Sequence, residues 1–299
     1  MKTLRALILR NSKLFFKDKG MFFTSIITPL ILLLLYTTFL GKIYRDSFSL
    51  FFPEGMEIPS KLIDGAVGAQ LLSSLLSVSC VTVAFCSNML TVQDKATGVR
   101  ADLTVSPVKP QTLALGYYVS SFISTVIVCA IATLASLIYI ASVGWYMSIG
   151  DVLLIFFDIL LLVMFGTALS SIINFFLSTQ GQISAVGTIV SSGYGFICGA
   201  YMPISQFNEG LQRVISFLPG TYATALLRNH AMRGAFAEME AIGVPAEAIN
   251  AARDAIDCNL YFLGNKVSVG AMFAVLGISV ALLIGAYVLL NVFFAKRAK

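Results

Sequence analysis

The chain has 299 residues, of which 58% are hydrophobic and 12% are charged, and its mean hydropathy is +0.87. A soluble domain of this size would carry about twice that share of charged residues, so the composition excludes a soluble globular protein. The sequence holds one histidine and no Cys-x-x-Cys pair, which argues against a metal site built by this chain.

Residues 1–20 are predicted to form an amphipathic helix that lies in the membrane interface. With about 100° between successive residues, the side chains separate into two faces. The apolar face holds Leu4, Leu7, Ile8, Leu14 and Phe15, and the basic face holds Lys2, Arg5, Arg10, Lys13 and Lys17. Such a helix turns its basic side toward anionic headgroups. The pattern fits either a simple anchor or a helix that also contacts a cytoplasmic partner.

Residues 21–299 are predicted to form an all-α polytopic membrane domain with six transmembrane helices. A helix needs about 20 apolar residues to cross the hydrocarbon. A polar hinge at 178–182 divides the apolar region that starts at residue 152 into two spans. The six spans lie at roughly 21–41, 66–92, 111–143, 152–177, 183–204 and 268–294. The first is no cleavable signal, because a basic helix precedes it and no Ala-x-Ala site follows it.

The second span is rich in small hydroxyl side chains. These are Ser73, Ser74, Ser77, Ser79, Thr82 and Ser87. Small residues let helices approach closely, and their hydroxyl groups can bond across the interface. Close packing is the favoured interpretation, and a pore-lining face is the alternative.

The loop after the second span carries mixed charges and a proline. Its marked residues are Asp94, Lys95, Gly98, Arg100, Asp102, Leu103, Ser106 and Pro107. The mixed charges predict a short exposed helix that docks on a soluble protein. Ser106 ends this helix, since the residue before a proline avoids the helical region.

Asp158 is the one charged residue inside a predicted span. Acids inside a membrane are functional candidates. At its shallow depth, a polar partner or a water-filled vestibule is favoured over a proton relay. Further along, Gly195 and Gly199 form a small-xxx-small pattern, which fits either a dimer axis or packing within the chain.

The fifth span ends in a segment broken by glycine and proline. Gly199 and Pro203 come first, and Pro219 and Tyr222 follow. Proline has no N–H to donate and clashes with the turn before it. In hydrocarbon, freed backbone groups need cover from protein or from a water-filled cavity. We therefore predict a re-entrant external gate after helix five.

Residues 229–266 are predicted to form an external insertion. Pro245 starts a small amphipathic helix in it, with Ile249, Ala252 and Ile256 on one face. This helix is expected to cap the outer exit, and no chemistry is assigned to the insertion.

Lysine and arginine concentrate in the predicted inner segments, which are 2–19, 95–109 and 296–299. The positive-inside rule then places both termini in the cytoplasm. The net charge of +5 reflects this bias, so it gives no sign of nucleic-acid binding.

Two segments resemble the ABC-2 type family of ABC-transporter permeases. In its external gate, G-x-x-x-P-[LI] precedes L-P-x-T-Y and an Ala/Leu run that closes on Arg. The matching residues are Gly199, Pro203, Ile204, Leu218, Pro219, Thr221, Tyr222 and Arg228. The inner loop resembles the family's coupling helix, which fits a groove of the ATPase. Gly98, Leu103, Ser106, Pro107 and Val108 match there. Val99 departs from the usual Thr, and Ala96-Thr97 replaces a charged pair.

The resemblance implies a drug- or polysaccharide-exporter-like permease subunit in the cytoplasmic membrane. Two copies, or one copy and a paralogue, would stand above two separate ATPase subunits that hold ATP and Mg. The coupling helix and the N-terminal helix would then transmit the energy of ATP. The path would lie between the second and fifth spans.

The chain has no G-x-x-x-x-G-K-[ST] loop and no Ser/His/Asp constellation, so we expect neither an enzyme nor a cofactor on it. The expected function is ATP-driven export or flipping of an amphipathic solute. A secondary transporter or channel without an ATPase is the alternative, and a non-transporting scaffold is a third possibility. The residues do not indicate the substrate.

Overall fold

The structure is a computed structural model that describes residues 2–52 and 58–297, and it is almost entirely helical. The helices are α1 (Lys2–Lys17), α2 (Lys19–Leu35), a π-helical turn (Tyr36–Leu40), α3 (Gly41–Ser49), α4 (Ser60–Ser87), α5 (Leu90–Ala96), α6 (Val99–Val105), α7 (Pro110–Val143), α8 (Ile149–Phe176), α9 (Gln180–Ile197), a 3-10 turn (Ile204–Gln206), α10 (Glu209–Ser216), α11 (Pro219–Ala241), α12 (Ala246–Ala255) and α13 (Val269–Arg297). A two-stranded antiparallel hairpin joins β1 (Tyr261–Phe262) to β2 (Asn265–Lys266). The predicted all-α class is confirmed.

Five helical stretches of the described chain are long and apolar enough to cross a membrane. They are Lys19–Phe48, Ser60–Ala96, Pro110–Val143, Ile149–Phe176 and Val269–Phe294. The predicted fifth span corresponds to α9, which begins with polar residues and ends at Ile197 rather than at 204. It ends early because Gly199 takes a left-handed backbone conformation with φ +74°, which a continuing helix does not allow. The predicted fifth span, 183–204, therefore stays a prediction, and with it the total of six.

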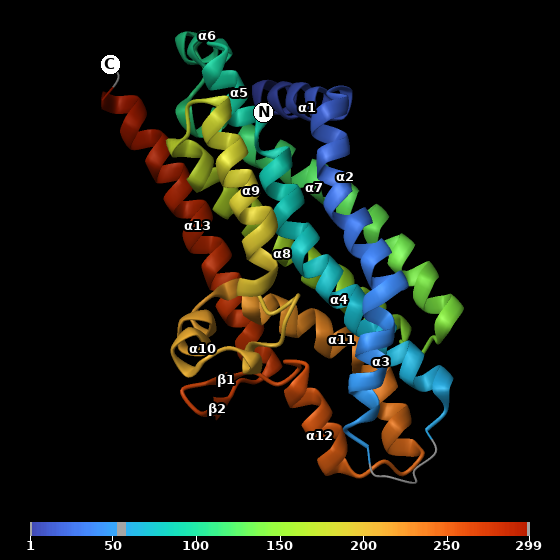
Figure 1. The fold of residues 1–299 in the computed structure, drawn as a ribbon. Helices are drawn as coiled ribbons and strands as arrows, with labels where there is room; N and C mark the ends of the chain where they lie inside the picture. Colours follow the sequence, from blue (N-terminus) through green and yellow to red (C-terminus); the bar gives the residue numbers. More distant parts are fainter. Residues whose placement is uncertain (1, 53–57, 298–299) are drawn as a thin grey trace.

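Helix α4 occupies the centre of the bundle, enclosed by α2, α7, α8, α9 and α11 (Figure 1). Nearly all its side chains are buried, and several of its hydroxyl groups bond within the protein, among them Ser77 to the Ser73 carbonyl and Ser87 to Thr125 of α7. Gly166 of α8 packs so closely that an added Cβ would lie 3.1 Å from the Val81 Cα. The packing interpretation of the second span is therefore confirmed. Within this chain α4 has no exposed pore-lining face.

Helix α11 is the main element that the sequence analysis missed. Residues up to 241 were assigned in part to an external insertion, yet α11 runs through them as a buried helix that packs on α4, α8 and α13. Met232 and Met239 on it are fully enclosed. The helix after Pro245 is present as α12, with Ile249 and Ala252 buried as predicted.

The first apolar helix extends further than predicted. The N-terminal helix α1 packs against the protein more than an interface helix would. The π-helical turn carries α2 beyond residue 41 into α3. The N-terminal helix α1 lies across one end of the bundle, where both termini, α5 and α6 also lie (Figure 1). Its side chains Leu7 and Phe15 are buried, and Leu7 packs with Leu113 and Tyr117 of α7, so this helix rests on protein as well as on any interface.

Candidate functional site

At the end of the bundle that holds both termini (the inner end in the predicted orientation), the predicted coupling loop consists of two short helices rather than one. Gly98 separates α5 from α6 and has φ +83°, a left-handed conformation that favours glycine. Asp94 and Lys95 belong to α5, and Arg100 and Asp102 belong to α6. The charged residues of this loop therefore face different surroundings.

Asp94 is buried and bonded within the protein. Arg10 of α1 donates to both of its carboxylate oxygens, at 2.7 and 3.1 Å. Tyr117 of α7 donates its hydroxyl to the same carboxylate at 2.6 Å. Such bidentate, charge-assisted bonds are the strong ones, and the bond to Asp94 raises the pKa of the Arg10 guanidinium. Asp94 therefore joins α1, α5 and α7, and the predictions that it faces a partner and that Arg10 faces headgroups were both wrong.

Lys95 and Arg100 are also held by this chain. The Lys95 ammonium donates to the backbone carbonyls of Asn174, Phe175 and Leu177 at 2.5–2.9 Å, at the end of α8, where helix carbonyls lack partners. Arg100 donates to the Asn291 side chain of α13 at 2.9 Å. Both were expected at a docking surface, but hydropathy and spacing could not reveal these partners, which lie far along the chain.

Helix α6 itself has no buried side chain. Asp102 and Thr104 are exposed, and Val105 is 88% exposed. Leu103 is half-buried against the cluster that holds Leu7 and Tyr117. The Ser106 hydroxyl donates to the Leu103 carbonyl at 2.6 Å, and the helix ends there as predicted. A short helix that packs on the protein through one side and exposes both polar and apolar side chains on the other is suited to docking on another protein.

At the opposite end of the bundle (the outer end in the predicted orientation), the broken segment has a defined geometry. After α9, the amides of Ala200 and Tyr201 both donate to the Gly195 carbonyl, at 2.9 and 3.0 Å, so Gly195 and Gly199 act together in ending this helix. Pro203 leads into the 3-10 turn, and Pro219 is the first residue of α11. Proline is favoured at that position because no helical partner needs its N–H. Pro219 therefore starts a helix rather than breaking one.

An ion pair between Arg228 and Asp257 holds the outer segment. The two groups lie 3.3 Å apart, and their side chains are only 3% and 7% exposed. Arg228 also donates to the Gly199 carbonyl at 2.6 Å and to Ser74 of α4 at 3.3 Å. Asp257 accepts from the Ile204 amide at 2.8 Å. Burial raises the pKa of Asp257, and the Arg228 charge opposes that rise.

This pair connects the central helix α4, the broken segment after α9 and the region after α12. Asp257 adopts φ +54°, a backbone conformation uncommon for a residue other than glycine. An added Cβ on Gly199 would lie 3.2 Å from its carboxylate, so Gly199 also makes room for the pair. The motif analysis marked Arg228, but no sequence signal named its partner, which lies in the insertion to which no chemistry was assigned.

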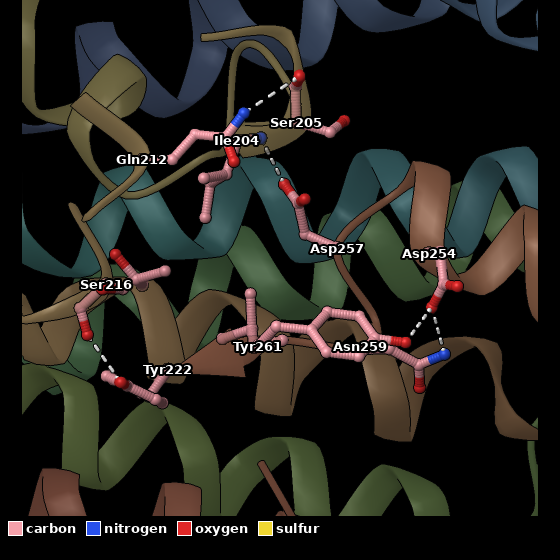
Figure 2. A pocket seen from close by; sticks show the side chains of 11 residues that line it. Ile204, Ser205, Gln212, Ser216, Tyr222, Asp254, Asp257, Asn259 and Tyr261 are labelled. Carbon is pink, nitrogen blue, oxygen red and sulfur yellow. Dashed lines mark hydrogen bonds between the residues drawn. The ribbon is translucent and has the colours of Figure 1, made fainter. Parts of the chain in front are cut away.

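A cavity of about 200 Å³ lies beside this ion pair, between α10, α11 and the segment after α12 (Figure 2). Tyr222, a predicted gate residue, lines the cavity and donates its hydroxyl to the Ser216 carbonyl at 2.5 Å. Asp254 accepts from Asn259 at 2.6 Å and from Tyr261 at 3.2 Å. Of the predicted gate residues, Tyr222 lines this cavity, whereas Gly199, Pro203 and Pro219 are not among its lining residues.

Asp158 has a polar partner. Its Oδ2 atom lies 2.6 Å from Nδ1 of His230, and both side chains are buried between α8 and α11. Phe273 of α13 stacks against the His230 ring, with 5.8 Å between centroids. This is the polar pairing that was favoured over a proton relay, and His230, which stood alone in the sequence, is its partner.

Comparison with known families agrees with both motifs. The family model described as ABC-2 type transporter matches residues 2–231. The chain therefore belongs to the ABC-2 type transporter family and is a multi-pass membrane protein, a permease component of an ABC transporter rather than an enzyme. No curated protein matches the chain. The matched range ends within α11, so α12, the hairpin and α13 lie outside it.

Proposed function

We propose that this chain is the membrane-spanning subunit of an ATP-driven exporter in the cytoplasmic membrane. The observation that carries the proposal is α6, a helix without a buried side chain at the inner end. The residues that fix the base of α6 all bind this chain: Asp94 and Lys95 of the preceding α5, and Arg100 of α6 itself. The exposed face of α6 is therefore available to a partner while its base stays fixed.

The partner that fits is a separate ATPase subunit, which would hold ATP and Mg. Two ATPases and two permease copies, identical or paralogous, would form the complex, since closed two-fold assembly is common. Because ATP is in the cytoplasm, docking on α6 would place both termini there as well. An ion pair at the outer segment would keep the gate closed until the ATPases act.

Helix α9 is the element best suited to line the path in such an assembly, and we count it as the fifth of six spans. Ser184, Thr188 and Ser192 recur every fourth residue along its exposed side. Each of the two later hydroxyls bonds back to its own helix, so the strip offers polar oxygen atoms without breaking the helix. The exposed position of α9 contrasts with the enclosed α4. An amphipathic solute is consistent with this mixture of hydroxyl and apolar side chains.

The test is the variant Asp102→Lys in the complex reconstituted with its ATPase. We expect the charge reversal to weaken co-purification and to abolish the change in ATPase rate that the permease causes. The matched control is Asp46→Lys, an exposed residue on α3, which lies at the opposite end of the bundle from α6 (Figure 1). Equal co-purification and equal ATPase rates in both variants would refute the docking role of α6. Transport without any bound ATPase would favour a secondary transporter or channel.

A further inference from the structure

Two neighbouring elements at the outer end expose large apolar side chains. Leu211, Val214 and Phe217 lie on α10, and Tyr261 and Leu263 lie on the hairpin, with exposed fractions from 41% to 72%. We call these five residues the outer apolar surface. The two elements are in contact, because the rings of Phe217 and Phe262 lie 5.1 Å apart at 82°. Figure 1 shows both elements beside the outer end of α13.

The surface of helix α10 has three strips of different character. Ile215 is buried against the protein. Leu211, Val214 and Phe217 follow one another at intervals of three residues and form an exposed apolar strip. The ion pair of Glu209 and Arg213, at 3.9 Å, occupies the next strip. A helix with adjoining apolar and charged exposed strips is typical of one that lies at a membrane interface.

Helix α12 shows that an external position does not by itself produce such a strip. It is also amphipathic and also outside the predicted spans, and it buries Ile249 and Ala252. Its exposed residues are small or polar, among them Glu247, Asn250 and Ala251. The large exposed side chains therefore distinguish α10 and the hairpin from a comparable helix of the same molecule.

The hairpin turn adds independent support. Leu263 and Gly264 both have positive φ, +50° and +83°. A two-residue turn of this kind favours Asn-Gly, and a bulky residue with positive φ is an outlier. Leu263 is also the most exposed member of the outer apolar surface, at 72%. The turn geometry does not explain a leucine at the tip, whereas contact with an apolar medium does.

The position of the surface indicates what that medium is. The hairpin ends at Lys266 and α13 begins at Val269, so the tip lies next to the point where a membrane-crossing helix starts. The apolar side chains of α13 are largely exposed, among them Ile278, Leu282 and Leu289, as expected for contact with lipid. The outer apolar surface continues this lipid-facing surface at its outer end. Tyr261 is of a residue type enriched at that level of a membrane.

We propose that the outer apolar surface binds the boundary between headgroups and acyl chains in the outer leaflet. It would anchor the segment between α9 and α11 to lipid. The proposal rests on α13 crossing the membrane and does not depend on an ATPase, so its test is separate from that of the proposed function.

The experiment uses tryptophan quenching by brominated phosphatidylcholine in proteoliposomes of the full-length chain. Trp145 is the only tryptophan, so Trp145→Phe gives a silent background. Single probes are then introduced as Phe217→Trp and Leu263→Trp, with Ala251→Trp on α12 as the matched control. We expect both probes to be quenched several-fold more strongly than the control. Bromines near the glycerol end of the acyl chain should quench more than bromines near its terminal methyl.

Two results would overturn the proposal. One is quenching at both probes no stronger than at the control, in proteins whose thermal unfolding matches that of the background. The other is disulfide formation between two copies of Leu263→Cys without quenching of the tryptophan probes, which would assign the surface to a second copy of the chain. Because the two probes lie on separate elements, local misfolding of one leaves the other informative.

Discussion

At the inner end of the molecule, the pair of Arg10 and Asp94 joins α1 to α5 and leaves α6 outside the contact. At the outer end, Arg228 and Asp257 bind the broken segment after α9 itself, through the Gly199 carbonyl and the Ile204 amide. An inner variant can therefore change docking without changing the fold. At the outer end the same residues hold both the fold and the predicted gate, so movement there would require a buried contact to break.

The largest expected effect in this comparison comes from Arg228→Ala. It leaves the Asp257 carboxylate buried without its charged partner, and breaking one side of a buried pair costs about 3–5 kcal/mol. Arg213→Ala is the matched control, because Arg213 is mostly exposed beside Glu209, and exposed pairs contribute about 0–1 kcal/mol. Thermal unfolding of the reconstituted chain measures both.

Adding Asp257→Asn to Arg228→Ala sharpens the same measurement. The double variant removes the unpaired charge, and asparagine tolerates positive φ, so part of the lost stability should return. Equal unfolding temperatures for Arg228→Ala and Arg213→Ala would contradict the account of the outer ion pair.

The same ion pairs explain which parts of the fold the sequence could predict. Long uncharged stretches identified α4, α7, α8 and α13 correctly, because hydropathy reports on crossing the membrane. Helix α11 was missed because its basic residues resemble those of a loop, yet each has an aspartate partner from another element. The pairs are Arg228–Asp257, His230–Asp158 and Arg233–Asp151. Such partners lie far along the chain, so local patterns cannot reveal them.

The site was predictable to a similar extent. Helices end or turns begin at Gly199, Pro203 and Ser106, as the sequence predicted, since glycine and proline act on the backbone next to them. The roles of Asp94 and Lys95 were not predictable, because charge and spacing alone do not distinguish a side chain that docks outward from one that bonds inward. Gly98, with its left-handed backbone, separates α5, which holds Asp94 and Lys95, from the exposed α6. A glycine inside a charged loop was the one sequence signal of this boundary.

An intermediate effect separates the two aspartates of the inner loop. Asp94→Ala removes the carboxylate that Arg10 and Tyr117 share, and hydrogen bonds to charged groups contribute about 1.5–3 kcal/mol. Asp102→Ala changes an exposed side chain and should alter unfolding by no more than about 0.5 kcal/mol. Chemical unfolding of the two variants in one lipid mixture makes the comparison. If Asp102→Ala is the more destabilising variant, the assignment of the two residues is reversed.

The smallest expected effect concerns the two prolines of the outer segment. Pro219→Ala should leave the basal ATPase rate of the complex unchanged, because Pro219 is the first residue of α11 and α11 keeps the same start with alanine. The stability of this variant should fall only by about 0.4–1 kcal/mol, which is what losing a proline costs through the unfolded chain. Pro203→Ala frees the backbone before the 3-10 turn, where the Pro203 carbonyl accepts from the Gln206 amide at 3.1 Å. Losing the rigid ring costs about 0.4–1 kcal/mol through the unfolded chain, and it loosens the loop that Asp257 holds. Basal ATPase activity should therefore shift in Pro203→Ala alone. A comparable shift in Pro219→Ala would show that α11 begins differently when the gate opens, and that the outer ion pair does not fix this segment by itself.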